Sequence, residues 1–130
     1  MALDEQVRKI IQGRNFAFLA TVGSDGSPQV TPVWVDEENG YILVNTAAGR
    51  VKERNTRRNP AVAVAVPEWS NPYRYAYVRG RVVEWITGPK ADEHIDKLAV
   101  KYTGEKFKWR RPGDVRVILK IKPDQAKVLG

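Results

Sequence analysis

The stretch NTAAGRVKERNTRR, residues 45–58, decides how this chain is interpreted. It continues a strand-like run, residues 41–46, through two alanines and a glycine into a short basic helix. Small residues at such a junction let a ligand approach the backbone, and the unpaired N–H groups of a first helical turn favour an anion. Arg50 and Lys52 add fixed charge at this point. The stretch therefore predicts either a phosphate site or a solvated basic helix face.

The length and composition are those of one globular domain, which we expect to span residues 1–130. Hydrophobic residues make up 42% of the chain and charged residues 28%, so the composition is not that of a disordered protein. The absence of cysteine excludes a disulfide framework and a thiolate metal site. The single histidine, His94, argues against a His-rich zinc site or a Ser-His-Asp triad. We therefore expect no metal.

The sequence also predicts a location in the cytoplasm. Residues 1–12 are amphipathic and carry acids early, which is typical of neither a signal peptide nor a transit peptide. No apolar run approaches the ~18 residues that span a bilayer, so we expect no membrane association. The net charge of +7 favours an anionic partner, which could be nucleic acid, a membrane surface or a small phosphorylated or polycarboxylate ligand.

Hydrophobic periodicity and turn residues predict a mainly β protein with three short peripheral helices. Helices are expected over residues 3–12, after Gly49 and after Gly88, with turns or loops at 23–27, 36–40, 67–72 and 109–113. Strands are expected at residues 16–22, 28–35, 41–46, 61–66, 73–85 and 114–121, with a short final one towards residue 128. Six to seven antiparallel strands linked by hairpins close most easily as a small β-barrel, which removes exposed edges.

Pro32 and Trp34 lie in a predicted strand and each allows two interpretations. Proline removes one ladder donor, so Pro32 marks either an unpaired barrel edge or a gap in pairing where a flat ligand lies along the backbone. Trp34 either stacks on a ligand ring or belongs to the core or an interface.

A second aromatic group lies on the predicted strand at residues 73–85. Tyr73, Tyr75 and Tyr77 alternate along it and project from one face, which Arg79 continues. Aromatic and arginine side chains suit an oligonucleotide surface, and they equally suit a dimer interface. No aromatic platform of a known RNA-binding motif is present, so the pattern favours the interface.

Residue types that carry catalysis are scarce in this chain. His94 lies among acids at the start of a predicted helix, where a solvated histidine is expected. Asp92 and Glu93 are neighbours on that helix and point apart, so they complement the helix dipole instead of forming a catalytic pair. We identify no catalytic residue, and an enzyme of this kind must take its chemistry from a cofactor.

Two motifs carry a resemblance to a known family. They are A-T-x-x-x-D-G-x-P-Q-x-x-P-V-W at residues 20–34 and G-R-x-K-x-R-N-x-R-R-x-P at residues 49–60. Together with NPYRYAYVRGRVVE, HIDKLAVKYTG and RPGDVRVILKIKP, they cover nearly the whole chain in order. The sequence resembles the flavin and deazaflavin split-barrel oxidoreductases, the pyridoxamine-phosphate-oxidase-like proteins, and most of all the branch that depends on the deazaflavin coenzyme F420.

The resemblance implies an antiparallel split β-barrel of the FMN-binding type, assembled as a homodimer with two cofactor sites at the interface. The cofactor phosphate would meet Arg50 and Lys52 on the basic helix, which also carries Arg57. The further cofactor-binding residues that it implies are Thr46, Ala47 and Ala48 near the phosphate, Thr31, Pro32, Val33 and Trp34 along the ring, and Tyr77 and Arg79, with Tyr75, from the partner or on the substrate side.

The function implied by the resemblance is hydride transfer from reduced F420 to a small electrophilic substrate such as a quinone or an enone. FMN is the alternative cofactor, because the related proteins that bind FMN use the same phosphate site. A protein that binds the cofactor without turnover is a further alternative. Nucleic-acid binding competes on charge and aromatic content alone, and we expect neither a nucleic acid nor a membrane as partner.

Overall fold

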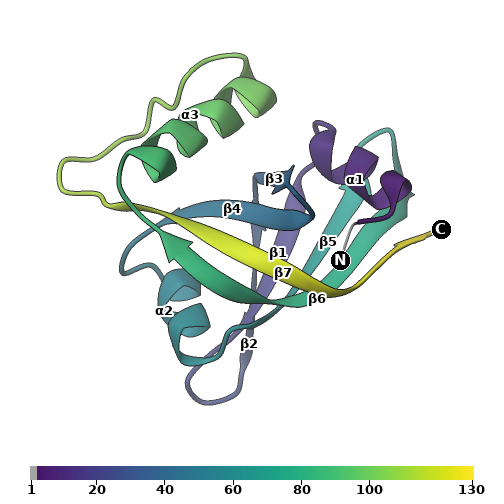
Figure 1. The fold of residues 1–130 in the computed structure, drawn as a ribbon, viewed down its shortest axis with the longest axis horizontal. Coiled ribbons are helices and arrows are strands. Elements are labelled where there is room, and N and C mark those ends of the chain that lie inside the picture. The colour runs from purple at the N-terminus through teal and green to yellow at the C-terminus, as the bar shows by residue number, and fades with distance from the viewer. Residues whose placement is uncertain (1–2) are drawn as a thin grey trace.

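The computed structural model describes residues 3–130 (Figure 1). Met1 and Ala2, which begin the predicted domain and its amphipathic first segment, lie outside the described residues. The helices are α1 (Glu5–Gln12), α2 (Val51–Arg58) and α3 (Pro89–Thr103). The strands are β1 (Ala17–Val22), β2 (Pro28–Val33), β3 (Val35–Glu38), β4 (Tyr41–Ala47), β5 (Ala61–Glu68), β6 (Asn71–Ile86) and β7 (Arg116–Leu129).

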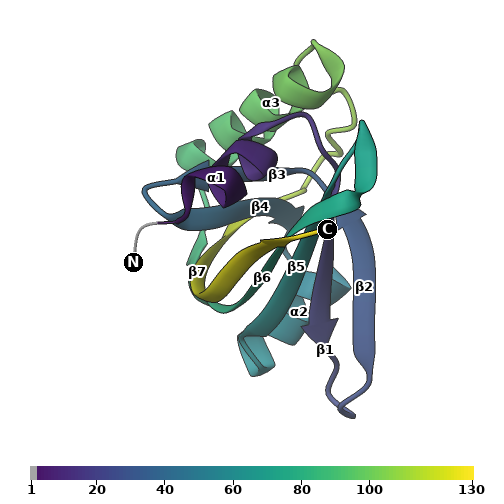
Figure 2. The same cartoon turned by 90° about the vertical axis from the view of Figure 1, so that its right-hand side faces the viewer.

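The strands form one antiparallel sheet in the order β2-β1-β5-β6-β7-β4-β3. Its two outermost strands, β2 and β3, are consecutive in the chain and separated only by Trp34. Because one residue joins the two edges, the sheet must curl until they meet, and Figure 2 shows the curled strands from the side. The predicted mainly β split barrel is confirmed.

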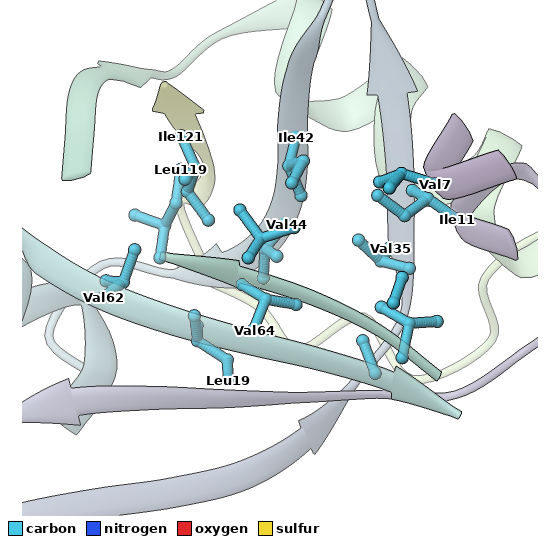
Figure 3. Close-up of a cluster of buried hydrophobic side chains, with 14 of the residues drawn as sticks. Val7, Ile11, Leu19, Val35, Ile42, Val44, Val62, Val64, Leu119 and Ile121 are labelled. Carbon is cyan, nitrogen blue, oxygen red and sulfur yellow. The ribbon is translucent and has the colours of Figure 1, made fainter. Parts of the chain in front are cut away.

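The core lies inside this curl. Valine, leucine and isoleucine side chains from most strands point towards one another there (Figure 3). Val7 and Ile11 of α1 join them beside Val35, and all three are fully buried. Asp4 caps α1 by accepting a hydrogen bond from the Gln6 N–H at 2.8 Å. Burial of this apolar surface supplies the main driving force for folding.

α3 covers the outer face of β4 and β7, where Ala91 packs with Leu43 and Ile118. The buried face of this helix includes Ile95, Leu98, Ala99 and Tyr102, which recur at helical spacing. Within residues 3–130, no helix has the length and apolar content that crossing a membrane requires.

Four segments differ from the sequence predictions. The predicted strand at residues 28–35 breaks at Trp34, and the predicted turn at 36–40 is mostly strand β3, with only Asn39 and Gly40 turning. Asn39 at φ 54° and Gly40 at φ 85° make so tight a turn that the acids before it stay in the ladder with β4. The predicted loop at 67–72 shrinks to Trp69 and Ser70, because β5 and β6 pair up to Glu68 and Asn71. The two expected final strands are one, β7.

Gly80 of β6 lies opposite a bulge in β7, where Asp124 is the extra residue between the partners of Arg79 and Gly80. The register with β7 shifts between Arg79 and Gly80. A Cβ atom at residue 80 would lie 2.2 Å from the Lys122 carbonyl oxygen, so only glycine allows the two strands to approach this closely. The close approach bends the long strands β6 and β7 into the barrel.

Candidate functional site

A cavity of about 600 Å³ opens at the junction of β4 and α2. It brings together six of the predicted site residues, namely Pro32, Val33, Trp34, Thr46, Arg50 and Lys52. The other residues that line it are Phe16, Asn45, Ile95, Leu98, Phe107, Trp109, Arg110, Arg111 and Arg116. The lining therefore contains five cations and no carboxylate, so the cavity is suited to an anion.

The loop before α2 is held by its own hydrogen bonds. The Ala48 N–H donates to the Val115 carbonyl at 2.8 Å, and the Gly49 N–H donates to Glu53 Oε1 at 2.9 Å. Arg50 is the N-cap residue with an extended backbone, and no side chain caps the helix. The N–H groups of the first turn are therefore not taken up by a side-chain cap, as an anion site at this helix start requires.

Arg50, Lys52 and Arg116 form a cation cluster. Within the described part of the chain, none of the three makes an ion pair. Burial lowers the pKa of Lys52, and the charges of Arg50 and Arg116 lower it further. Burial, followed by the charge of Arg50, also lowers the pKa of Arg116, although the charge of Asp114 opposes this shift. Each cation raises the free energy of the others, and a bound anion would relieve that repulsion.

Arg116 is the most buried member of the cation cluster, with an exposed fraction of 7%. Its Nε donates a hydrogen bond to Asn45 Oδ1 at 2.9 Å, and its guanidinium lies 5.1 Å from the centre of the Phe107 ring. A buried charge is costly unless it is paired. An arginine that is buried without a carboxylate at the wall of a cavity is therefore a strong indication of an anionic ligand.

Two predicted site residues carry buried hydroxyl groups that have no hydrogen-bond partner among residues 3–130. They are Thr46 Oγ1, on the cavity wall, and Thr31 Oγ1, on β2. Buried polar atoms are almost always paired, and exceptions call for an explanation such as a ligand. The Thr46 hydroxyl, the helix start and the cation cluster together form a site suited to a phosphate group.

The opposite wall of the cavity is aromatic. Trp34 stacks on Tyr102 with ring centres 5.5 Å apart and planes 7° apart, and it meets Phe107 edge-on at 6.4 Å. Tyr102 is fixed in turn, because its hydroxyl donates to the Asn15 carbonyl at 2.7 Å. Trp34 therefore packs inside the protein, as one of its two interpretations predicted, and it also lines the cavity.

The remaining predicted site residues do not line the cavity. Thr31, Ala47 and Ala48 adjoin it in sequence, and the Ala48 N–H is already donated within the chain. Arg57 lies at the far end of α2, where its Nε donates to Glu53 Oε2 at 2.8 Å and its guanidinium lies 4.8 Å from the centre of the Trp85 ring. The position of Arg57 is that of a structural residue.

Tyr77 and Arg79 lie on the outer face of the sheet. Registered pairs place Pro32, Phe18, Ala65 and Tyr77 in one row across β2, β1, β5 and β6. On β5 only the valines are buried, and the alanines, which lie on this outer face, are at least partly exposed. Strand β2 lies at the edge of the sheet, as one interpretation of Pro32 predicted.

The prediction of a solvated His94 is wrong. The side chain is 7% exposed and lies between α3 and β4, where Nδ1 is 3.1 Å from Asn45 Nδ2. Burial lowers the pKa of His94 to about 4, although the charge of Asp36 opposes this shift. The sequence placed acids beside His94 along the helix, but it did not show that the histidine faces the sheet.

Sequence reasoning missed several residues of the cavity, and Arg116 is the most informative of them. Arg116 lies on the same face of β7 as Ile118, and α3 covers this face. The alternation of residues along the strand was therefore the signal that could have placed Arg116 near α3. Phe107, Trp109, Arg110 and Arg111 belong to the connection between α3 and β7, which carries no periodic pattern that could place them.

Comparison with known proteins is consistent with this geometry. The family model described as pyridoxamine 5'-phosphate oxidase matches residues 3–130. A solved structure described as an F420 reductase is 31% identical, with a TM-score of 0.82, and the match covers 96% of this chain and 98% of that one.

Two further structures are similar in fold. A conserved hypothetical protein from Mycobacterium tuberculosis is 23% identical, with a TM-score of 0.76 over 99% of this chain and 86% of that one. A putative pyridoxamine 5'-phosphate oxidase from Listeria innocua is 19% identical, with a TM-score of 0.71 over 96% of both chains. The chain belongs to the pyridoxamine 5'-phosphate oxidase family, which has a flavin-binding split-barrel fold and includes oxidoreductases.

Proposed function

We propose that this protein is an oxidoreductase that uses reduced coenzyme F420 to deliver hydride to a small electrophilic substrate such as a quinone or an enone. The observation that carries the proposal is the unpaired cation cluster of Arg50, Lys52 and Arg116 beside the start of α2. The 31% identity to an F420 reductase over nearly the full length of both chains supports the choice of cofactor.

Each part of the cavity has a role in this proposal. Arg50, Lys52 and the hydroxyl of Thr46 would hold the phosphate, since charge-assisted hydrogen bonds are the strongest available to an exposed anion. Pro32, Val33 and Trp34 would lie along the ring. Arg111, which makes no ion pair among residues 3–130, would suit the anionic glutamate tail of the coenzyme, whereas Arg110 pairs with Asp92 and Asp96.

The bound deazaflavin would supply the hydride, and the protein would supply position and a dry environment. Val33, Trp34 and Phe107 give the cavity an apolar wall that excludes water from a ring lying against it. Holding two reactants near contact removes much of the entropic barrier of their reaction. No acid–base pair is required of the chain, in line with the lack of a histidine or carboxylate on the cavity wall.

FMN is the second candidate cofactor. The same cation cluster fits its phosphate, and the family binds flavins such as FMN. A cofactor-binding protein without turnover would need the same cavity.

Titration of the purified protein with each cofactor, followed by absorbance and fluorescence, tests the proposal. We expect micromolar binding of F420 and sustained reduction of quinones, enones or nitroaromatics by the reduced coenzyme. Micromolar binding of FMN with no binding of F420 would show that the protein uses FMN as its cofactor. Tight binding of F420 without turnover of any of these substrates would leave a binding protein.

We also propose that the protein is a homodimer. The outer row formed by Pro32, Phe18, Ala65 and Tyr77 is largely apolar, and Phe18 remains 43% exposed in the single chain. Pro32 belongs both to this row and to the cavity, so a second copy seated on this face would help to close the cavity. Tyr77 and Arg79 would then lie at the interface, as the resemblance implies.

Sedimentation velocity tests the dimer. We expect a dimer for the native chain and a monomer for Ala65→Arg, which places a charge in the middle of the row. The control is Val100→Arg, at an exposed position of α3 outside the row, which should remain dimeric. A native monomer, or an Ala65→Arg protein that is still a dimer, would reject this interface.

A further inference from the structure

Arg116 is connected to the interior of the protein by a chain of hydrogen bonds that has only one consistent assignment. A guanidinium Nε can only donate, so the Asn45 atom 2.9 Å from it must be the oxygen. The Asn45 nitrogen then faces the Ala91 carbonyl at 2.9 Å, which can only accept. Both contacts require the same orientation of the Asn45 amide. The positions of its oxygen and its nitrogen are therefore fixed by the donor and the acceptor that they face.

The same reasoning fixes His94. Asn45 Nδ2 donates at 3.1 Å to His94 Nδ1, which must therefore be unprotonated, with the imidazole proton on Nε2. A doubly protonated ring would place two donors against each other at this contact. The nearest carboxylate oxygen to Nε2 belongs to Asp36, at 4.0 Å, and Lys97 already pairs with that oxygen at 3.2 Å. His94 is thus held neutral, as an acceptor.

We propose that His94 and Asn45 are positioning residues that hold the Arg116 guanidinium against the cavity as a binding group for an anionic part of the ligand, a phosphate or a carboxylate. His94 is on α3 and Asn45 and Arg116 are on neighbouring strands, so three elements fix one side chain. Only the Nε of Arg116 is used within the described residues, and its two terminal nitrogens have no hydrogen-bond partner there. The inference rests on the proposed function only in placing the ligand in this cavity.

The hydrogen bonds from His94 through Asn45 to Arg116 would favour anion binding because they pre-organise the arginine. A free arginine loses rotamer entropy when it binds an anion, and a side chain already held by Asn45 and stacked by Phe107 has lost it beforehand. Removing the acceptor at residue 94 should loosen Asn45 and with it Arg116, while the net charge of the cavity stays the same. The expected effect is therefore weaker anion binding without a change in cavity charge.

The chain contains a single histidine, so ¹⁵N-histidine labelling gives one imidazole signal pair. We expect Nδ1 to show the shift of an unprotonated nitrogen and Nε2 that of a protonated one at neutral pH, and the signals to move when inorganic pyrophosphate is added. The opposite tautomer, or a rapid mixture of both, would overturn the proposal. This measurement needs no variant and no cofactor.

Affinity for pyrophosphate and for F420, measured by calorimetry, gives the second test. His94→Leu removes the acceptor and should weaken both affinities about five- to tenfold, as expected for one lost hydrogen bond in a charged network. His94→Asn, whose side-chain oxygen replaces Nδ1, should stay within about twofold of the native protein. Lys90→Met, which removes a lysine of the same helix that pairs with Glu38 and not with Asp36, is the matched control and should change neither affinity.

The outcomes separate this inference from the proposed function. If neither cofactor binds but pyrophosphate affinity follows the predicted order of variants, the proposed function fails and the positioning role stands. Equal pyrophosphate affinity in the native, His94→Leu and Lys90→Met proteins would reject the positioning role. No binding of pyrophosphate by the native protein at millimolar concentration would reject Arg116 as an anion-binding group.

Discussion

The two ends of helix α2 carry similar side chains in opposite circumstances. At its start, Arg50 and Lys52 face the cavity without a counter-charge, and neighbouring cations raise their free energy. At its end, Arg57 pairs with Glu53 and Arg58 donates to Asn55 Oδ1 at 2.8 Å. The basic residues at the two ends of α2 therefore have different roles. The cations without partners indicate a binding site, and those with partners hold the helix in place.

The largest effect should follow from removing both cations at the start of the helix. Arg50→Ala combined with Lys52→Ala should weaken F420 binding about a thousandfold, because two charge-assisted contacts are lost. Lys52→Ala alone should cost at least about tenfold. Fluorescence titration measures both. An affinity of the double variant within threefold of the native value would show that the cation cluster does not bind the ligand.

Lowering the pH should reduce the free energy of unfolding through His94, the buried histidine that contacts Asn45. The folded-state pKa of His94, about 4, lies below its ordinary value of 6.5, so the unfolded chain takes up the proton first. Stability should therefore fall as pH decreases from 6.5 to 4, by about 3 kcal/mol, and level off below. Urea unfolding across this range measures the slope. His94→Asn should lose most of it, and an unchanged slope in that variant would assign the effect to other groups.

The far end of the helix should affect stability and leave binding unchanged. Arg57→Ala leaves the buried Glu53 without its ion pair and removes the contact with Trp85, so we expect a loss of about 1 kcal/mol in the free energy of unfolding. The affinity for F420 should stay within about twofold. A tenfold loss of affinity in this variant would remove the distinction between the two ends of α2.

The smallest effect has the opposite sign. Because the folded-state pKa of Lys52 is lowered, its charge costs stability at neutral pH, and this cost disappears only when pH rises past its ordinary pKa. Lys52→Met should therefore stabilise the ligand-free protein by about 0.5 kcal/mol, or about 2 °C in Tm, while it weakens binding. Calorimetric melting measures this change. A lower Tm would mean that the charge is compensated within the chain.

Most of the fold followed from local patterns. Hairpin turns, alternation and the proline and glycine at the start of α3 gave the strands and helices to within a few residues. The break at Trp34 could not be predicted, because it results from the closure of the sheet and not from local preference. The acids at residues 36–38 were predicted to form a turn because their polar side chains do not favour a strand. They form one because β4 pairs with them, and this pairing is not visible in the local sequence.

The candidate site was half predictable. Arg50 and Lys52 are local to the strand-to-helix junction, so the sequence displays them together. Arg116 and His94 act through partners on other elements, and nothing in the local sequence connects residues 45, 94 and 116. Arg57 was assigned to the site because it continues a basic run, and only the positions of Glu53 and Trp85 show that its charge is used within the protein.

The central claim is that the unpaired cation cluster binds the phosphate of a deazaflavin cofactor. The most direct test compares the dissociation constants of F420 and of the corresponding deazaflavin riboside, which has the same ring and lacks the phosphate and the tail. The account predicts that F420 binds at least about a hundredfold more tightly, and that this advantage disappears in the Arg50→Ala, Lys52→Ala double variant. Equal affinity of the native protein for the two compounds would contradict it.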